Sequence, residues 1–323
     1  MIFERQLYVL SGVSLDNMKD SKAHLALLFV NVLYGASHVL AKGIMPNFLS
    51  PNVFILFRVV GATFLFWILL IFIQREKILK KDLLRLAFCG LFGVAVNQLC
   101  FFHGLNLSSS INSGIIMALN PIMVLILSYF LLKDKPSVLN AIGIFIGAFG
   151  AVLLTWKGAT GSTDSWKGDI FLFLNALSYA IYLVIAKPLM LRYKPLTVIT
   201  WVFTFGLVFV LLFPPTVNDL MLTSFEFPTL IWLKIIYVVI GVTFLTYLLT
   251  MYGLKFLSPS VSSAYIYTQA IFVVGFTFLF ATLNWSEDYR DSISFEKIGF
   301  MLIIFVGVYL STLKTKKIQK EHE

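Results

Sequence analysis

Charged side chains are scarce in this chain. They make up 13% of its 323 residues and hydrophobic residues 59%, against about a quarter and about a half in soluble domains. The few charges are also segregated, so that the stretches 53–73, 105–132 and 258–283 hold almost none. Each stretch is long enough to cross a hydrocarbon core of about 30 Å. Because lipid offers no water to backbone groups, these stretches are expected to be helices, and a soluble domain is excluded.

Cysteine is also rare, with only two residues in the chain. Cys89 and Cys100 lie on one predicted helix, where the α-helical rise separates them by about 16 Å. A disulfide tolerates a Cα separation of at most about 7 Å. A disulfide framework is therefore excluded, and both thiols are expected in the core or against lipid.

Catalytic and ligand-binding motifs are missing. None of the sixteen carboxylates lies deep in an apolar stretch, and the chain has no HExxH motif and no serine nucleophile elbow. The GATGS segment at 158–162 lacks the lysine that must follow in a phosphate-binding loop. No enzyme, metal site or cofactor is therefore expected. A channel is not favoured either, because the sequence shows no charged or carbonyl-lined filter.

The net charge of +9 raises the question of nucleic acid binding. The basic residues lie in loops between apolar stretches, however, without the aromatic and glycine-rich context of RNA-binding modules. Membrane topology accounts for them, because short cytoplasmic loops are enriched in Lys and Arg. The more basic side comprises the N-terminal lead, the loops near 75–81, 133–135, 192–194 and 255, and the tail. That side is predicted to be cytoplasmic, with both termini on it.

What the sequence does contain is ten apolar stretches with short connections, which predict an all-α polytopic membrane protein. The lead 1–22 is expected to be cytoplasmic, with no signal peptide and with Met18 as an alternative translation start. A basic tail, also expected in the cytoplasm, covers 314–323. The ten predicted spans are 24–41, 52–73, 83–102, 112–132, 139–156, 169–186, 196–213, 230–252, 260–283 and 297–313.

The ten stretches form two copies of five. Shifting GLNLSSSINSG at 104–114 by 149 residues places four of its residues on identical ones in GLKFLSPSVSSAY at 253–265. Asn31 and Asn175, like Pro51 and Pro195, occupy matching places in the two halves. Because five is odd, the second copy must insert upside down, which predicts two inverted-topology repeats at 23–157 and 168–313. This architecture suits alternating access, with substrate near the midplane where the repeats meet.

Three features of the first half follow in order: GLNLSSSINSG, the Asn120-Pro121 pair with its LLKDK exit, and glycines at 143, 147 and 150. Together with GLKFLSPSVSSAY in the second half, they resemble the EamA type of the drug/metabolite transporter superfamily. The resemblance covers nearly all of 24–313. It implies a ten-helix carrier, commonly an exporter of amino acids or related metabolites, with a central cavity lined by the first, third, fourth, sixth, eighth and ninth helices. The chain departs from the pattern at Ala270, which matches Pro121, and in a longer exit loop in the second copy.

Polar and aromatic side chains form matching stripes on several predicted spans. Asn31, Tyr34 and His38 share one face of the first span. Asn175, Tyr179 and Tyr182 share a face of the sixth. We interpret these stripes as a substrate site; interhelical hydrogen bonding, worth about 0.6 kcal/mol on average, is the alternative. The predicted substrate-binding residues are Asn31, Tyr34, His38, Asn97, Gln98, Asn120, Tyr179, Tyr182, Tyr247, Tyr265 and Gln269.

Four further residues are candidates for gating or coupling. Pro121 removes a backbone donor and frees a carbonyl a turn earlier, which can face substrate or mark a packed kink. Arg58, about 9 Å into the second span, can snorkel to the outer interface, serve a structural role, or pair with a substrate carboxylate. Lys42 and Lys187 are related by the repeat, and are either snorkelling anchors or gate residues.

Proton coupling has few candidate groups. The lack of deep carboxylates argues against a carboxylate relay, since an ionised group in the bilayer usually marks function. His38 and His103 remain, with an ordinary pKa of about 6.5 that suits coupling. A lone histidine within a membrane is more often a hydrogen-bonding residue, so both interpretations stay open.

The function predicted from these observations is secondary transport across an inner membrane, exporting a small zwitterionic or aromatic metabolite. The tyrosines can enclose an apolar side chain, and the amides can bind amino and carboxyl groups, so amino acids are the expected class. Export of lipophilic drugs is the first alternative, because the spans are also rich in Phe and Met. A receptor or scaffold without transport is the second.

The expected partners are a small-molecule substrate and the lipid bilayer, without nucleic acid. A homodimer is an open alternative, because small residues on two spans predict close helix contact. The contact is either a brace within the chain or an interface between two copies. The glycines concerned are Gly143, Gly147, Gly150, Gly299 and Gly307.

Overall fold

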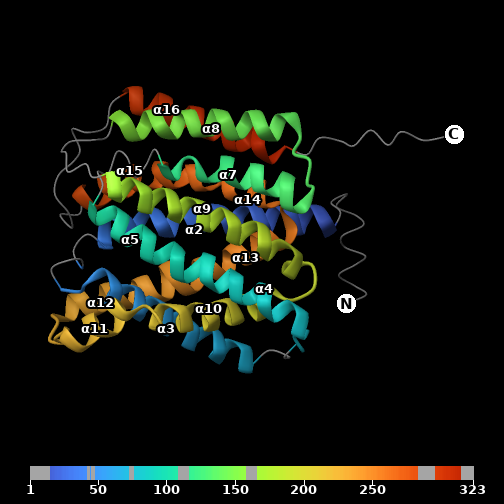
Figure 1. The fold of residues 1–323 in the computed structure, drawn as a ribbon. Helices are drawn as coiled ribbons and strands as arrows, with labels where there is room; N and C mark the ends of the chain where they lie inside the picture. Colours follow the sequence, from blue (N-terminus) through green and yellow to red (C-terminus); the bar gives the residue numbers. More distant parts are fainter. Residues whose placement is uncertain are drawn as a thin grey trace, which may run out of the picture.

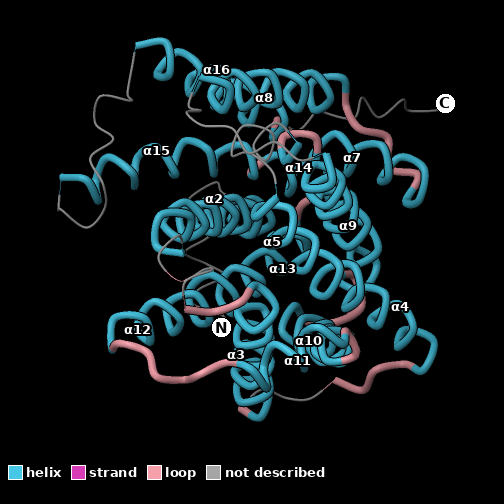
Figure 2. The backbone as a smooth tube through the Cα atoms, turned by 60° about the vertical axis from the view of Figure 1, so that its left-hand side comes forward, coloured by secondary structure: helices cyan, strands magenta, loops and turns pink. Residues whose placement is uncertain are grey.

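The computed structural model describes residues 15–41, 44, 48–72, 76–107, 116–157, 166–282 and 295–313. Within these ranges the chain forms helices joined by short connections, and no strand (Figures 1 and 2). The first helix begins within the stretch predicted as a lead. The helices are α2 (Leu15–Ala41), α3 (Pro51–Ile71), α4 (Lys80–Gly90), η1 (Leu91–Val96), α5 (Asn97–Leu107), α7 (Asn120–Leu127), η2 (Ser128–Leu132), α8 (Val138–Lys157), α9 (Trp166–Met190), α10 (Pro195–Leu211), α11 (Pro214–Leu222), α12 (Thr229–Tyr237), η3 (Val238–Leu245), α13 (Thr246–Phe256), α14 (Pro259–Ala264), α15 (Ile266–Thr282) and α16 (Phe295–Thr312).

Several of these helices can cross a membrane by length and composition. Within the described residues four do so alone, and α10 with α11 makes a fifth if the pair, bent by 75°, is one span. Shorter apolar helices cover Asn120–Leu132, Val138–Leu153 and Ile298–Thr312. The four long spans are Pro51–Ile71, Lys80–Leu105, Trp166–Met190 and Thr229–Phe256. The described part of the chain therefore has the make-up of a polytopic membrane protein.

Serine-proline pairs start two of the helices. Ser50 caps α3, where its Oγ accepts a hydrogen bond from the amide of Val53 at 3.3 Å. Ser258 caps α14 in the same way, with the amide of Val261 at 3.3 Å. The proline that follows each serine has its φ preset for a helix and lacks an N–H that would have no partner there. Both helix starts are thus encoded locally.

Two long spans contain a π-helical segment in the middle. η1 separates α4 from α5, and η3 separates α12 from α13. Widening of the helix leaves carbonyls with altered partners, and in η3 the Oγ1 of Thr243 donates to the carbonyl of Val238 at 2.9 Å. Such segments occur often at functional sites. The sequence predicted continuous helices here, because apolar periodicity hardly changes over so short a stretch.

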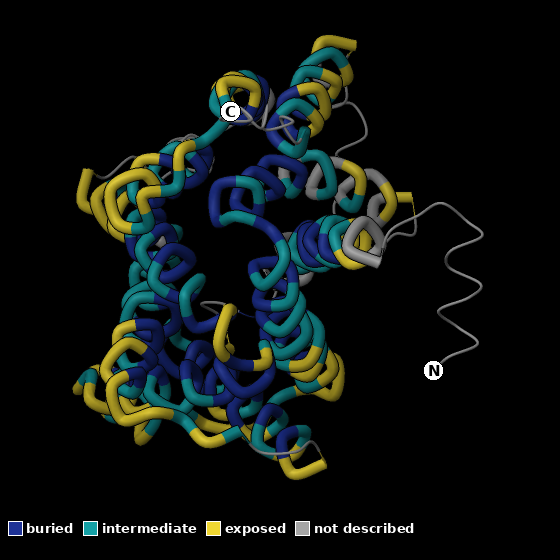
Figure 3. Tube along the Cα trace, turned by 90° about the vertical axis from the view of Figure 1, so that its right-hand side faces the viewer, coloured by how far each residue is buried: buried dark blue, intermediate teal, exposed yellow. Residues whose placement is uncertain are grey.

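The buried side chains form two main cores. One includes Phe66 of α3, Phe203 of α10 and Tyr247 of α13, with ring centroids 5.1 and 4.8 Å apart in succession. The other includes Tyr267 of α15 and Ile304 of α16. Figure 1 shows α8 and α16 on one side of the molecule and α3, α10 and α12 on the other, with α2 and α9 between them. Buried segments lie toward the inside and exposed ones toward the outside (Figure 3).

Helices α8 and α16 pack against each other at very close range. A Cβ added at Gly143 would lie 2.6 Å from the carbonyl of Gly307, and one at Gly307 would lie 2.6 Å from the Cα of Gly147. Beside this crossing, the side-chain amide of Asn140 donates to the carbonyl of Ser311 at 2.7 Å. Three of the predicted glycines thus form a brace within the chain.

Candidate functional site

Tyrosines from three helices gather in the first core, the one that contains Tyr247. Thr246 Oγ1 donates to Tyr34 Oη of α2 at 3.2 Å, and Tyr247 Oη of α13 donates to the carbonyl of Gly93 at 3.1 Å. On α9, Tyr179 packs on the same core as Tyr34 and Tyr247. The stripes predicted on separate spans are therefore brought together by the fold.

Tyr182 belongs to the same group but is completely enclosed. Its ring lies 5.9 Å from that of Tyr179, centroid to centroid, and its hydroxyl donates to Met251 Sδ at 3.3 Å. The backbone of Gly93 lies directly against the ring. Tyr182 therefore packs against the cluster with no exposed surface, whereas Tyr34 and Tyr179 are only partly buried.

Arg58 of α3 lies beside these tyrosines, with only 8% of its surface exposed. Its Nε donates to Thr243 Oγ1 at 3.0 Å, and its guanidinium carbon lies 5.1 Å from the ring centre of Phe102 and 5.8 Å from that of Phe54. Thr246, three residues after Thr243, donates to Tyr34 Oη, and in the described residues no carboxylate pairs with Arg58. The side chain points into the protein rather than snorkelling to an interface.

Three buried amide side chains carry polar atoms without a hydrogen-bond partner in the described structure. Asn120 donates to the carbonyl of Ala176 at 2.7 Å, and Asn175 donates to the carbonyl of Asn97 at 2.7 Å. The Oδ1 atoms of Asn120 and Asn175 and the Oε1 atom of Gln98 have no partner. Such buried orphan atoms are rare and call for an explanation, such as a bound ligand or water.

Asn175 was not among the predicted binding residues, although it lies on the predicted stripe of the sixth span. Its position four residues before Tyr179 is the signal that identifies it. Thr243 and Thr246 were also missed as partners of Arg58 and Tyr34. Nothing in the local sequence indicates that these two threonines face other helices.

The remaining predicted binding residues lie in different surroundings. Asn31 donates to the carbonyl of Leu27 on its own helix at 2.8 Å. Tyr265 Oη and His24 Nδ1 are 2.7 Å apart, a pairing that the sequence did not predict. Gln269 is partly buried on α15. The side chain of His38 lies outside the described part of the structure.

Asn120 and Pro121 begin α7, and a turn at Ala118 interrupts the helical conformation before them. The carbonyl of Ala118 accepts a hydrogen bond from Tyr267 Oη at 3.1 Å. A second break occurs at Tyr265, between α14 and α15. The helical segments before α7 and α15 are therefore both interrupted. In the interruption before Pro121, the carbonyl of Ala118 has a tyrosine as its hydrogen-bond donor.

Lys187 of α9 binds the end of another helix. Its ammonium donates to the carbonyls of Leu254, Lys255 and Leu257 at 2.6, 3.3 and 2.7 Å. These groups belong to the last turn and exit of α13, where carbonyls lack helical partners. Lys42, its predicted counterpart, lies outside the described residues.

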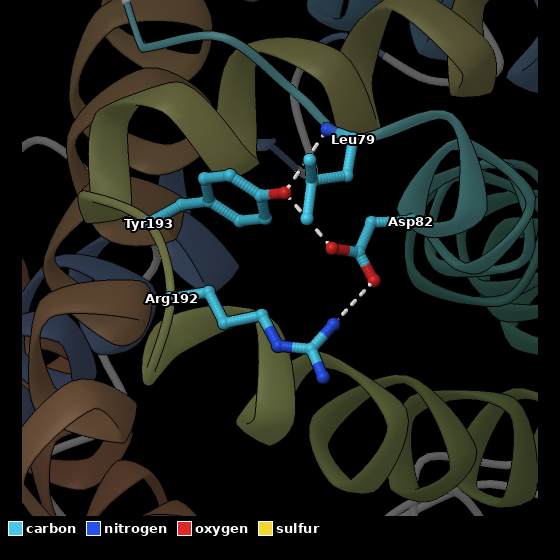
Figure 4. A network of polar contacts seen from close by, with 4 residues as sticks. All are labelled: Leu79, Asp82, Arg192 and Tyr193. Atoms are coloured by element: carbon cyan, nitrogen blue, oxygen red, sulfur yellow. Dashed lines mark hydrogen bonds and ion pairs between the residues drawn. The ribbon is translucent and has the colours of Figure 1, made fainter.

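Polar clusters lie at opposite ends of α3. Beyond its C-terminus, Asp82 of α4 pairs with Arg192 at 2.7 Å and accepts a hydrogen bond from Tyr193 Oη at 2.8 Å, while Tyr193 accepts from the amide of Leu79 at 3.1 Å (Figure 4). Burial raises the pKa of Tyr193, so its hydroxyl stays protonated and able to donate. This cluster ties α4 to the connection between α9 and α10.

At the N-terminus of α3, Asp219 of α11 accepts hydrogen bonds from Ser50 Oγ at 2.7 Å and Asn52 Nδ2 at 2.9 Å. His103, a candidate for proton coupling, lies 3.0 Å from the Oδ1 of Asn52 through its Nε2. The histidine is thus held in a hydrogen-bonded chain that ends on a carboxylate.

Comparison with known proteins supplies the context for this site. The model of the EamA-like transporter family matches residues 21–156 and 166–313. The chain is 28% identical over 196 residues to the uncharacterized transporter YyaM of Bacillus subtilis, covering 59% of this chain and 64% of YyaM. It is 27% identical over 256 residues to YetK of the same organism, covering 76% of each. An uncharacterized transporter of Archaeoglobus fulgidus is 24% identical over 300 residues, covering 91% of this chain and 99% of that protein.

A solved crystal structure shares the fold. Its TM-score with this chain is 0.68, and the match covers 90% of this chain and 96% of the other at 18% sequence identity. At that identity the likeness concerns the arrangement of helices alone.

Proposed function

The chain belongs to the EamA-like transporter family, and from this premise we propose that it is a secondary carrier that exports amino acids or related small metabolites. Its relatives, which are named as transporters, support transport as the activity. The distribution of Lys and Arg supports an inner membrane location with both termini in the cytoplasm.

We further propose that the chain consists of two inverted repeats of five helices. The family model matches twice, at 21–156 and 166–313. An offset of 149 residues, which superposes the sequence copies, carries η1 onto 240–245, within η3. Ala118 and Tyr267, which hydrogen-bond to each other, are also 149 residues apart. A contact between equivalent positions is expected on a pseudo-two-fold axis.

One observation carries the proposed transport function: the buried polar cluster beside the tyrosines of the first core. Its side chains come from α2, α3, α5 and α7 of the first half and from α9 and α13 of the second. Hydroxyls, amide oxygens with no partner and a cation surrounded by apolar helices form a hydrogen-bonding site away from bulk water. A carrier that alternates access between two halves needs such a site where they meet.

The side chains favour a small substrate with polar and apolar parts. Tyr34 and Tyr179 offer ring faces and hydroxyls, and the amides of Gln98, Asn120 and Asn175 offer acceptors. An amino acid uses both kinds of surface. Sugar phosphates would call for several deep cations, and Arg58 is the one in this cluster.

Counterflow in proteoliposomes tests the proposal. Proteoliposomes that contain the purified protein are loaded with one unlabelled amino acid at a time. Uptake of the same amino acid in labelled form is then followed. We expect saturable counterflow for at least one amino acid, reduced about tenfold or more by Asn120→Ala and Tyr179→Ala. Phe64→Ala, on the exposed face of α3, is the matched control and should transport normally. Absence of counterflow for every amino acid, combined with counterflow of a lipophilic drug, would refute the amino acid assignment.

A further inference from the structure

Arg58 is a buried cation whose counter-ion is missing from the described part of the chain. Only 8% of its surface is exposed, and no described carboxylate lies within ion-pair distance. Burying an unpaired charge is costly, and a protein that keeps one normally uses it. The residue therefore needs either an anion from outside the chain or a purely structural compensation.

The contacts of Arg58 fix its guanidinium but do not saturate it. Thr243 accepts from Nε, and the rings of Phe54 and Phe102 lie within cation–π range. The two terminal nitrogens have no acceptor among the described residues. Those nitrogens form the planar fork that matches the two oxygens of a carboxylate.

The surroundings of Arg58 favour a negatively charged ligand group. Thr243, which accepts from its Nε, lies three residues before Thr246, which donates to Tyr34 Oη, so an uncharged hydroxyl group is nearby. Gln98, whose Oε1 has no partner, lies beside the hydroxyl of Tyr247. The described cluster thus holds one positive charge and no negative one.

A second group of unpartnered atoms lies where α7 contacts α9. Tyr179 of α9 packs on the same core as Tyr34 and Tyr247. Asn175 lies one helical turn from Tyr179, which places their side chains about 6 Å apart on one face. Asn120 binds the carbonyl of Ala176, the residue after Asn175. The free Oδ1 atoms of both asparagines are acceptors only, and an ammonium group is a donor only.

We propose that Arg58 binds the carboxylate of the transported molecule and that the free oxygens of Asn120, Asn175 and Gln98 receive its amino group. The carrier then selects zwitterions, and discriminates against amines that lack a carboxylate. This inference rests on the proposed function and assigns the two ends of the substrate to two places in its site.

A matched set of three compounds tests the selectivity without any mutation. L-phenylalanine, 2-phenylethylamine and 3-phenylpropionate share the aromatic ring, and the last two lack the carboxylate and the amino group respectively. Each compound is added as a competitor of the labelled amino acid that gives the strongest counterflow. Binding of each compound is also measured, as the shift that it causes in the melting temperature of the purified carrier. If another amino acid gives the strongest counterflow, its own amine and desamino acid replace this set.

We expect the amino acid to compete at least tenfold more strongly than either analogue. An amine that competes as well as the amino acid would overturn the assignment of Arg58. If no amino acid shows counterflow in the wild-type carrier, the proposed function itself fails, which is a different result from counterflow without carboxylate selectivity.

Substitutions then locate the selectivity. Arg58→Gln should weaken competition by the amino acid at least tenfold and leave competition by the amine unchanged. Lys234→Gln on α12 removes a positive charge outside the cluster and should leave both unchanged. Arg58→Lys keeps the charge without the fork, and should retain the preference for carboxylates at lower affinity.

Correct folding is checked by a monodisperse elution profile in detergent. A folded Arg58→Gln variant with the wild-type preference for carboxylates would overturn the proposal. If that variant does not fold, the wild-type comparison of the three compounds decides alone, because it does not depend on any substitution.

Discussion

Lys187 shows at the scale of one residue how a side chain secures a distant helix end. Its ammonium lies at hydrogen-bond distance from three carbonyls at the exit of α13. A cation at a helix C-terminus also interacts favourably with the helix dipole. The repeat in the sequence predicted that this lysine is either a snorkelling anchor or a gate residue. Its partners lie 67 to 70 residues away and depend on how α9 packs against α13.

Replacing this lysine should destabilise the protein. Hydrogen bonds to a charged group contribute about 1.5–3 kcal/mol each at most, and these three share one group, so we expect Lys187→Met to lower the free energy of unfolding by about 2 kcal/mol. The measurement is the melting temperature in detergent. Lys255→Met removes a cation from the same helix end, and should melt like the wild type because its ammonium makes no hydrogen bond in the described structure. Equal melting temperatures for both variants would show that the capping bonds contribute nothing.

The π-helical segments are the informative features at the scale of elements. η1 brings the backbone of Gly93 against the ring of Tyr182 and its carbonyl to Tyr247. Gln98 and Tyr247 follow η1 and η3 at positions 149 residues apart, so equivalent places in the two halves contribute to one cluster. The widened turns thus change the direction in which the side chains after them point from the helix axis.

A methyl group at Gly93 should disrupt this arrangement. The added Cβ would lie 2.5 Å from Tyr182 Cγ, and Tyr182 is fully buried and cannot move aside. Overpacking of this kind costs about 1–3 kcal/mol, so we expect Gly93→Ala to lower both the melting temperature and transport. Gly241→Ala in η3 is the control, because its nearest neighbour would be 3.4 Å away. Wild-type stability in both variants would mean that η1 can relax.

Sequence reasoning succeeded for elements with a local signal and failed for those without one. Pro51 and Pro195 begin helices as their fixed φ predicts, whereas Pro121, expected inside one continuous span, is the second residue of α7. The break at Tyr265 has no proline to predict it. The π-helical segments η1 and η3 keep the apolar pattern of an ordinary helix, so only the structure reveals them. The tyrosine stripes were predicted from spacing, whereas the Arg58–Thr243 bond, across 185 residues, was not.

At the scale of the whole molecule, α2 and α9 connect two packed bodies. α2 packs on α15 and α13, and α9 packs on α5 and α7. The polar clusters built on Asp82 and Asp219 instead tie helices around α3 to their neighbours on the same side. The helices that carry Tyr34 and Tyr179 therefore lie where the two bodies meet.

The brace between α8 and α16 makes a prediction about oligomeric state. Gly307→Ala would place a Cβ against the backbone of Gly147, which cannot give way, so we expect a loss of stability with an unchanged mass by light scattering. Gly299→Ala on the same helix meets nothing within 4 Å and should be neutral or slightly stabilising. If Gly307→Ala instead kept its stability and changed the mass, the glycines would belong to an interface between copies.

The same brace cannot form until α16 has been synthesised, so α8 is without this partner for a time during translation. Asn140 must find a carbonyl 171 residues further along the chain, and at ribosomal speeds of about 5–20 residues per second that partner emerges roughly 10 to 30 seconds later. Until then the face of α8 that carries Gly143 and Gly147 has no α16 packed against it in the bilayer. An insertion factor or a neighbouring nascent helix can bind this face. Slowing translation after α8 should therefore lower the yield of correctly assembled carrier more than slowing it before.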